Sequence, residues 1–407
     1  MKGFITKALH VKKRAKDVYG SLRMPVYDSA AFEFDTCEEL ADVSLGKLPK
    51  HVYSRSSNPT VEDFELHVKA LSNAFGVLSL GSGMAAITTA ILTLVKSGDS
   101  IVTTKYLFGH TLSFFQNTLP NMGVEVRFVD VMNEDEVKGA FSKTTKLLFL
   151  ETISNPQLQV ANIKNLSKLA HSFNAPLIVD TTMTPFYTFD AKKFGVDVEV
   201  LSSTKFISGG GTSIGGLILD HGIYDWKQSE LLEKYYKKAG PFAFMYKARK
   251  EIFQNLGAVL SPHNAYLQTL GLETMALRID RACSNTIELS KWLEGIKEIK
   301  NVNHPSLDSS PYNKMAKEQF KYAGSILTFE VEDEKKAFSF MNKLQLIRRA
   351  TNIQDNKSLI ISPYHVIYPF NSHEEKMSLH IPPYLMRLSV GIEDIEDLKE
   401  DITQALK

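Results

Sequence analysis

The sequence predicts an α/β protein with a mostly parallel sheet covered by helices on both faces, followed by a smaller α+β domain. Between residues 76 and 203, short apolar runs alternate with helical stretches, which is typical of parallel strands joined by helices. Several of these runs lack polar alternation, as strands buried on both faces do. After Ser261 the pattern changes to one long helical stretch and then to separated strands, which indicates a second domain.

The first 60 residues are predicted to form an irregular N-terminal arm, because Pro25 and Pro59 interrupt a stretch with few periodic runs. From Val61 to Phe75, apolar residues recur mostly at three- and four-residue spacings, which predicts a helix with one buried face. Strands are expected at 76–80, 100–105, 124–130, 146–151, 176–180 and 198–203, with a helix at 84–96 and further helices between the later strands. These elements form a predicted large domain, residues 61–257.

The predicted smaller domain comprises residues 258–407. Its long helical stretch covers residues 264–296. Strands are expected within 324–333, 358–362 and 384–390, and a polar helix within 392–406.

The composition is that of an ordinary globular protein and favours no strongly charged partner. Lys and Arg number 47 and Asp and Glu 46, so nothing in the net charge of +1 indicates nucleic acid or an acidic membrane. The longest uncharged apolar stretch, Met84–Val95, is shorter than the roughly 20 residues that span a bilayer. Cys37 and Cys283 form neither a metal-binding pair nor a disulfide network. We therefore expect a cytoplasmic protein without a metal site.

A glycine-rich turn lies between the first predicted strand and the following helix. Residues 81–86, GSGMAA, would place free backbone N–H groups at a helix start, which suits a phosphate. The alternatives are a tight strand-to-helix turn without a ligand, or the dinucleotide fingerprint G-x-G-x-x-A. A dinucleotide site needs an acid after the next strand, but Asp99 precedes that strand, which weakens this alternative.

Two further residues follow predicted strands. Asp180 ends the run PLIVD, and Lys205 follows VEVLSST just before a run of glycines. Alone, Asp180 is equally well explained as a helix cap or loop acid. A surface position explains Lys205 poorly, because it follows a strand and two hydroxyl residues and precedes glycines. The carboxyl ends of parallel strands form the crevice in which α/β sheets bind ligands. A phosphate site, an acid and a lysine at one such edge are the groups that pyridoxal 5′-phosphate requires.

Six motifs then occur in order: Tyr53–Thr60 (YSRSSNPT), Gly81–Ala86 (GSGMAA), Glu151–Pro156 (ETISNP), Val179–Thr182 (VDTT), Ser202–Lys205 (SSTK) and Arg387–Gly391 (RLSVG). From about Tyr27 onward the chain resembles the cysteine and methionine metabolism family of pyridoxal-phosphate enzymes. The resemblance implies the aspartate-aminotransferase-like fold, fold type I. Segments 211–220, 224–226, 260–265 and 271–274 are most similar to the O-acetylhomoserine sulfhydrylases.

The resemblance implies a role for each matching residue at the cofactor. Lys205 would hold pyridoxal phosphate as a Schiff base, and Asp180 would pair with its ring nitrogen. The resemblance also assigns cofactor contacts to Tyr53, Arg55, Gly83, Met84, Phe108, Asn155, Thr182, Ser202 and Thr204. Of these, the Gly83 and Met84 amides and the Ser202 and Thr204 hydroxyls would bind the phosphate, and Asn155 would contact the ring hydroxyl. Tyr53 and Arg55 would reach the phosphate of a neighbouring subunit.

Two residues are implied at the substrate. Arg387 lies within the apolar run YLMRLSV, where an unpaired guanidinium would be costly to bury, so a grip on the substrate α-carboxylate explains it better than an exposed edge. Ser358 is implied as a second carboxylate contact. Phe108 departs from the family, in which many members have a tyrosine at this position; it can stack on the cofactor ring but cannot transfer a proton.

The resulting expectation is a γ-replacement transferase. O-acetyl-L-homoserine and sulfide, or a carrier-borne sulfur, would give L-homocysteine and acetate in methionine biosynthesis, in a homodimer with shared sites or a homotetramer. Cystathionine γ-synthase, O-succinylhomoserine sulfhydrylase and a methionine or cystathionine γ-lyase are the alternatives on the same cofactor. A dinucleotide-binding protein and a purely structural or regulatory protein on this fold are the alternatives without it.

Overall fold

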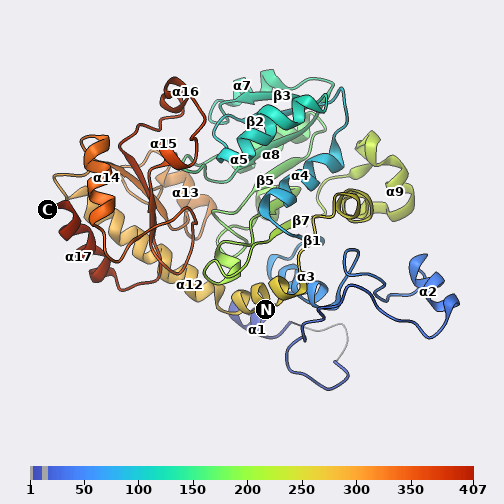
Figure 1. The fold of residues 1–407 in the computed structure, drawn as a ribbon. Helices are drawn as coiled ribbons and strands as arrows, with labels where there is room; N and C mark the ends of the chain where they lie inside the picture. The colour runs from blue at the N-terminus through green and yellow to red at the C-terminus, as the bar shows by residue number, and fades with distance from the viewer. Residues whose placement is uncertain (1–2, 12–16) are drawn as a thin grey trace.

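The structure, a computed structural model, describes residues 3–11 and 17–407 (Figure 1). Two sheets dominate these residues: one of seven strands in the order β1-β7-β6-β5-β4-β2-β3, and one of five strands in the order β10-β11-β12-β9-β8. The strands of the large sheet are β1 (Gly76–Leu80), β2 (Ser100–Thr104), β3 (Glu125–Val129), β4 (Thr145–Glu151), β5 (Leu177–Asp180), β6 (Val198–Leu201) and β7 (Gly216–Asp220).

The large sheet is mostly parallel, with one reversed strand. Strands β6, β5, β4, β2 and β3 pair in parallel, so their carboxyl ends lie at one edge. Strand β7, which the sequence analysis did not predict, pairs antiparallel with both β1 and β6. The parallel part places the ends of β4, β5 and β6 next to one another.

Both faces of the large sheet are buried. Along β4, Leu147 and Phe149 lie in one apolar core, whereas Leu148 and Leu150 lie in another on the opposite face. This alternation follows from the two-residue period of a strand. Helices cover the sheet: α3 (Pro59–Ser72), α4 (Gly83–Leu94), α5 (Gly109–Ser113), α6 (Leu119–Asn121), α7 (Glu134–Ala140), α8 (Ile163–Ser172), α9 (Glu233–Ala239), α10 (Ala243–Lys247) and α11 (Gln254–Leu256).

The N-terminal arm is less irregular than predicted. It contains α1 (Phe4–Leu9) and α2 (Cys37–Ser44). Helix α1 is stabilised by tertiary packing, since the Phe4 ring lies 4.7 Å from that of Tyr187. Helix α2 is stabilised locally. The Thr36 hydroxyl accepts the Glu39 N–H, and the Glu39 carboxylate in the first turn interacts favourably with the positive end of the helix dipole. In Figure 1, α2 extends away from the body of the protein.

The smaller sheet belongs to the C-terminal domain. Its strands are β8 (Lys300–Asn303), β9 (Ile326–Glu330), β10 (Arg348–Arg349), β11 (Leu359–Ile361) and β12 (Leu385–Ser389). The 33-residue helix α12 (Pro262–Glu294) contacts α3 at one end and β8 and β9 further along, so it connects the two domains. The remaining helices are α13 (Asn313–Gln319), α14 (Glu334–Lys343), α15 (Pro363–Val366), α16 (His373–Ser378) and α17 (Ile395–Leu406).

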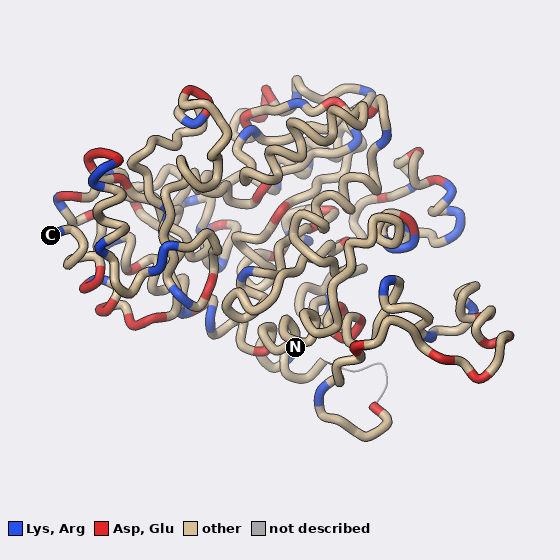
Figure 2. The backbone as a smooth tube through the Cα atoms, in the orientation of Figure 1, with Lys and Arg blue, Asp and Glu red and all other residues tan. Residues whose placement is uncertain are grey.

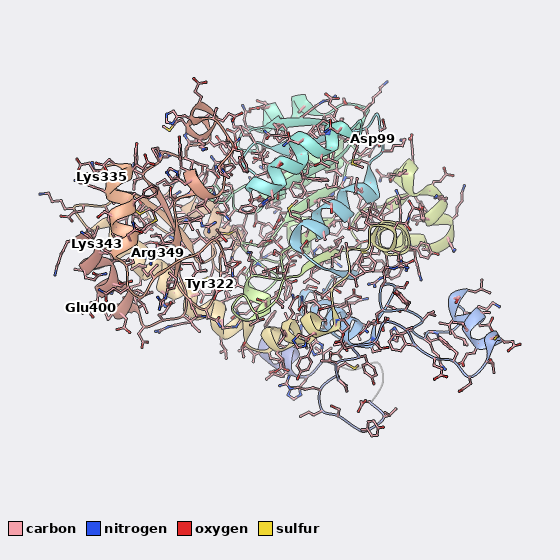
Figure 3. The ribbon with its side chains drawn as sticks, viewed as in Figure 1. Asp99, Tyr322, Lys335, Lys343, Arg349 and Glu400 are labelled. Atoms are coloured by element: carbon pink, nitrogen blue, oxygen red, sulfur yellow. The ribbon has the colours of Figure 1, made fainter. Side chains whose placement is uncertain are left out.

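The polar surface carries both signs of charge throughout. Figure 2 shows acidic and basic residues interspersed over both domains. On the C-terminal domain, Lys335, Lys343 and Glu400 lie on the side away from the large sheet (Figure 3). Among the described residues, no helix combines the length and apolarity that crossing a membrane requires.

Replacing Phe149 with alanine tests the packing of the apolar core on one face of the large sheet. Phe149 is fully buried on β4, with its ring 5.0 Å from that of Phe115. We expect Phe149→Ala to lower the free energy of unfolding by roughly 3 to 5 kcal/mol, because it removes a large side chain and leaves a cavity. The measurement is the urea unfolding curve of the large domain. Met132→Ala, at a 40% exposed position, is the control and should change the free energy of unfolding by less than about 0.5 kcal/mol. An equal effect of both variants would contradict this packing.

Candidate active site

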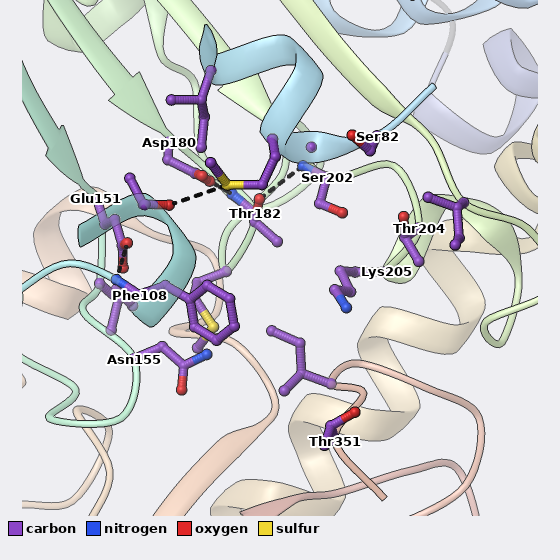
Figure 4. Close-up of a pocket in the computed structure, with 18 of the residues that line it drawn as sticks. Ser82, Phe108, Glu151, Asn155, Asp180, Thr182, Ser202, Thr204, Lys205 and Thr351 are labelled. Atoms are coloured by element: carbon purple, nitrogen blue, oxygen red, sulfur yellow. Dashed lines mark hydrogen bonds between the residues drawn. The ribbon is translucent and has the colours of Figure 1, made fainter. Parts of the chain in front are cut away.

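A cavity of about 320 Å³ lies at the carboxyl-end edge of the large sheet, facing the C-terminal domain. The large domain contributes the start of α4, the ends of β4 and β5, and the segment after β6. The C-terminal domain contributes Thr351, Ile353 and Arg387. Figure 4 shows Asp180, Lys205, Phe108 and Thr351 around this space. The cavity therefore collects side chains from both domains.

The start of α4 supplies the candidate anion site. Ser82 caps the helix by accepting the Ala85 N–H, and this leaves the Gly83 and Met84 N–H groups beside the cavity. Only glycine fits at position 83, since a Cβ there would lie 2.7 Å from the Cβ of Ser202. Free N–H groups and the positive end of the helix dipole favour an anion. Thr204, whose hydroxyl interacts with the Gly215 backbone, lines the same part of the cavity.

Lys205 follows β6 and points into the cavity. Its Nζ donates to Asn352 Oδ1 at 2.6 Å. Burial disfavours the ammonium form, and the positive charge of Arg387 adds to this, so the pKa of Lys205 falls to about 8. A lysine with this pKa is neutral often enough near neutral pH to act as a nucleophile or a base.

Two carboxyl groups lie at the ends of adjacent strands. Glu151 of β4 and Asp180 of β5 are register partners. Burial raises the pKa of Asp180 to about 6, opposed by hydrogen bonds from Thr182, whose N–H donates to Oδ1 at 2.8 Å. Burial, and then the charge of Asp180, raises the pKa of Glu151 well above its usual value. Each acid would be stabilised by a nearby positive group.

Arg387 is fully buried on β12 and contacts only neutral acceptors. Its Nη1 donates to Asn155 Oδ1 at 3.3 Å, and Nη2 donates to the Thr351 carbonyl at 3.0 Å. Its Nε has no partner. Burial lowers the pKa of Arg387 to about 9. An unpartnered donor on a buried guanidinium fits a carboxylate ligand.

The structure brings most of the predicted site residues to this one cavity: Gly83, Met84, Phe108, Asn155, Asp180, Thr182, Ser202, Thr204, Lys205 and Arg387. Tyr53 and Arg55 do not line it. The Arg55 guanidinium lies 5.6 Å from the centre of the Tyr53 ring and donates to the Gln254 carbonyl at 3.1 Å. Tyr53 is 45% exposed, so it lies at the surface of the protein and not in the cavity.

The structure corrects the expectation for Ser358. This serine is fully buried outside the cavity, where its hydroxyl donates to Glu393 Oε2 and accepts the Gly391 N–H. Thr351 and Asn352 lie at Arg387 instead, through their backbone carbonyls. No sequence pattern marks these two loop residues. Glu151 was also missed as a site residue, although its place at the end of β4 follows the same rule as Asp180.

These residues fit pyridoxal phosphate. The group needs an anion site, an acid for the ring nitrogen and an amine that forms a Schiff base. The start of α4, Asp180 and Lys205 provide them around one cavity, and the unpartnered Nε of Arg387 leaves a place for an amino-acid carboxylate. Fold and site together define a pyridoxal-phosphate enzyme of fold type I.

The chain belongs to the family of Cys/Met metabolism PLP-dependent enzymes, which it matches over residues 5–407. A solved structure of O-acetylhomoserine sulfhydrylase from Wolinella succinogenes is 58% identical, covers all of both chains and has a TM-score of 0.83. A putative O-acetylhomoserine (thiol)-lyase from Campylobacter jejuni is 30% identical over the full length of both chains, with a TM-score of 0.93. That structure carries pyridoxyl-lysine-5′-monophosphate at its own position 205.

A further relative has a different activity in its name. L-methionine gamma-lyase from Fusobacterium nucleatum is 34% identical over all of this chain and 98% of its own. The family, the fold, the pyridoxal phosphate cofactor and the enzyme class are therefore established.

Replacing Asp180 with asparagine tests two effects of its carboxylate: the destabilisation of the apoenzyme and the binding of the cofactor. The pKa of Asp180 is raised to about 6 in the folded protein. Above about pH 6, ionisation of this carboxyl group therefore destabilises the apoenzyme. We expect Asp180→Asn to stabilise the apoenzyme at pH 7 by about 3 kcal/mol, an advantage that disappears as the pH falls from about 6 to about 4. It should also weaken cofactor binding. The measurements are urea unfolding across pH and titration with pyridoxal phosphate.

Asp220→Asn is the matched control for that variant. Burial also raises the pKa of Asp220 to about 6, but its carboxylate accepts from the Gly222 N–H and Trp226 Nε1 outside the cavity. It should leave cofactor affinity unchanged. Equal cofactor affinity of the Asp180→Asn and wild-type proteins would contradict the pairing of Asp180 with the ring nitrogen.

Proposed function

We propose that this protein is an O-acetylhomoserine sulfhydrylase that converts O-acetyl-L-homoserine and a sulfur donor into L-homocysteine and acetate in methionine biosynthesis. The observation that carries the proposal is the 58% identity, over the whole chain, to the O-acetylhomoserine sulfhydrylase of Wolinella succinogenes. The cavity supports it because it combines a cofactor site with a carboxylate site for an amino acid.

We assign residues to each group of the cofactor. The Gly83 and Met84 N–H groups with the Ser202 and Thr204 hydroxyls would bind the phosphate, Asp180 would pair with the ring nitrogen, and Lys205 would hold the cofactor through its amine. Phe108 would stack on the ring and Asn155, which accepts from Arg387, would contact the ring hydroxyl, whereas Thr182 orients Asp180 through its N–H. When bound, pyridoxal phosphate supplies an electron sink for the α-carbon of an amino acid.

Lys205 is the proposed proton carrier. Burial favours the neutral form of the Lys205 amine. Once the substrate amine has replaced it, this amine would carry one substrate proton at a time: it would take the α-proton, release it, and only then take a β-proton. Acetate leaves from Cγ, sulfur adds to Cγ, and the two protons return to Cα and Cβ. Among the described residues that line the cavity, the other ionisable side chains are Glu151, Asp180 and Arg387. Phe108 has no hydroxyl, so proton transfer falls to Lys205.

Arg387 is the proposed anchor of the substrate. Its free Nε and its neutral partners allow the guanidinium to turn toward an α-carboxylate without breaking an ion pair. Asn155 and Thr351 then keep it in place. A carboxylate held by Arg387 of β12 sets the α-carbon between the two domains, on the side from which Lys205 enters.

Tyr53 and Arg55 are proposed to complete the site of a second subunit. Both lie outside their own cavity, and Arg55 carries a charge that suits a phosphate. A homodimer with shared sites, or a tetramer of two such dimers, follows from this arrangement. Cys37 and Cys283 are both free, which supports a cytoplasmic enzyme.

The alternative function is a lyase that degrades methionine or cystathionine, favoured by the 34% identity to L-methionine gamma-lyase. The phenylalanine at position 108 argues against it, since a lyase has more use for a phenol that returns protons. Cystathionine γ-synthase and O-succinylhomoserine sulfhydrylase differ from the proposal only in the thiol and the acyl group.

A substrate matrix tests the proposed reaction. Acetyl-, succinyl- and phosphohomoserine and acetylserine are each combined with sulfide, cysteine and a protein thiocarboxylate. We expect acetylhomoserine to give homocysteine and acetate in equal amounts, measured by thiol and acetate assays. Lys205→Ala is the control and should lower kcat by about a thousandfold. Release of 2-oxobutanoate from methionine or cystathionine, without exchange on acetylhomoserine, would favour the lyase.

Subunit mixing tests the shared site. Arg55→Ala and Lys205→Ala proteins should each be nearly inactive. A mixed dimer contains one site in which both defects fall together and one site that is intact, so mixing after subunit exchange should restore part of the activity. The measurement is homocysteine formation before and after mixing, with the two proteins mixed without exchange as the control. No recovery in dimers shown to be mixed would contradict the proposed contribution of Arg55.

A further inference from the structure

The connection between β11 and β12 packs on the large domain beside the cavity. This connection, residues 362–384, carries α15 and α16 and is called the capping segment here. A Cβ on Gly109 would lie 2.5 Å from the Ile367 carbonyl oxygen, so glycine permits this close approach. Gln157 Nε2 donates to the Leu379 carbonyl at 3.0 Å. In Figure 1, α15 lies at the boundary between the two domains.

Tyr368 lies at the centre of the capping segment. Its side chain is 2% exposed, and its hydroxyl donates to the Leu107 carbonyl of the large domain at 2.9 Å. Burial raises the pKa of Tyr368 far above its usual value, so the phenol stays protonated and remains a donor. This hydrogen bond therefore joins the two domains directly behind Phe108.

One peptide group is held from both domains. The Leu107 carbonyl accepts from Tyr368, and the N–H of the same peptide, that of Phe108, donates to Glu151 Oε1 at 2.8 Å. The ring of Phe108 carries no polar atom that could orient it. The position of the Phe108 ring in the cavity thus depends on the orientation of the Leu107–Phe108 peptide and on the packing of the ring.

We propose that Tyr368 is a positioning residue that fixes the Leu107–Phe108 peptide, and through it the Phe108 ring against the cofactor, when the capping segment is docked. The inference rests on the proposed function only for the role of Phe108 as the stacking ring. The capping segment leads directly into β12, which carries Arg387. Docking of this segment therefore links the stacking ring to the anchor of the substrate.

The test compares cofactor binding by Tyr368→Phe and wild-type apoenzyme. We expect the variant to bind pyridoxal phosphate about fivefold more weakly, because the buried Leu107 carbonyl loses its partner and the peptide loses its fixed direction. The visible circular dichroism of the bound cofactor should also decrease, since it reports how the ring is held. Tyr364→Phe is the matched control: its hydroxyl contacts His373 within the same segment, and it should behave as wild type.

A second background distinguishes positioning from general stability. In Phe108→Leu protein the stacking ring is already absent, so Tyr368→Phe should weaken cofactor binding no further. The same fivefold loss in both backgrounds, or no loss in either, would overturn the inference. If Tyr368→Phe does not fold, Gln157→Met takes its place, because it removes the hydrogen bond from Gln157 to the Leu379 carbonyl of the capping segment. It should weaken cofactor binding in the wild-type background and not in Phe108→Leu. An equal loss in both backgrounds, or no loss in either, would again overturn the inference. These measurements use the cofactor without substrate, so they stand whether or not the sulfhydrylase assay succeeds.

Discussion

The arrangement of charge in the cavity is the constraint on which the rest of the structure depends. Arg387 is a buried cation, whereas Lys205, Glu151 and Asp180 are half-buried at the cavity, and the partners observed for each are neutral groups. Burying such groups without opposite charges is unfavourable, which the shifted pKa values of all four express. A ligand with a positive ring nitrogen, a phosphate and a carboxylate supplies the missing charges.

The fold meets this constraint by placing the groups on elements that cannot move separately. Strands β4, β5 and β6 pair in parallel, so the acids and the lysine segment lie at neighbouring strand ends, and α4 begins at the same edge. Arg387 comes from the other sheet, and α12 connects the two domains. The proposed reactive amine thus belongs to one domain and the proposed carboxylate anchor to the other, so a substrate would be held where the two domains meet.

The departure at Phe108 gains meaning from its surroundings. A ring without a hydroxyl neither transfers a proton nor orients itself by hydrogen bonding. In the proposed mechanism the first consequence assigns proton transfer to Lys205, and the second leaves the placement of the ring to its backbone. The peptide before Phe108 is bound by Glu151 on one side and by Tyr368 on the other. The absence of a hydroxyl at position 108 therefore bears on two things: which residue is proposed to transfer protons, and how the capping segment holds the ring in place.

The sequence by itself determined most elements of the large domain and the groups at their ends. The unbroken apolar runs indicated strands buried on both faces, and Gly83, Asp180 and Lys205 each follow or precede such an element directly, so local order was enough to bring them together. Tertiary structure alone decided the reversed direction of β7, helix α1 in the arm, and the contacts of Thr351 and Asn352 with Arg387. It also removed Ser358 from the cavity and placed Tyr368 behind Phe108. These contacts join residues from different elements or loops, and the packing of the elements sets their distances, so no periodicity along the chain reveals them.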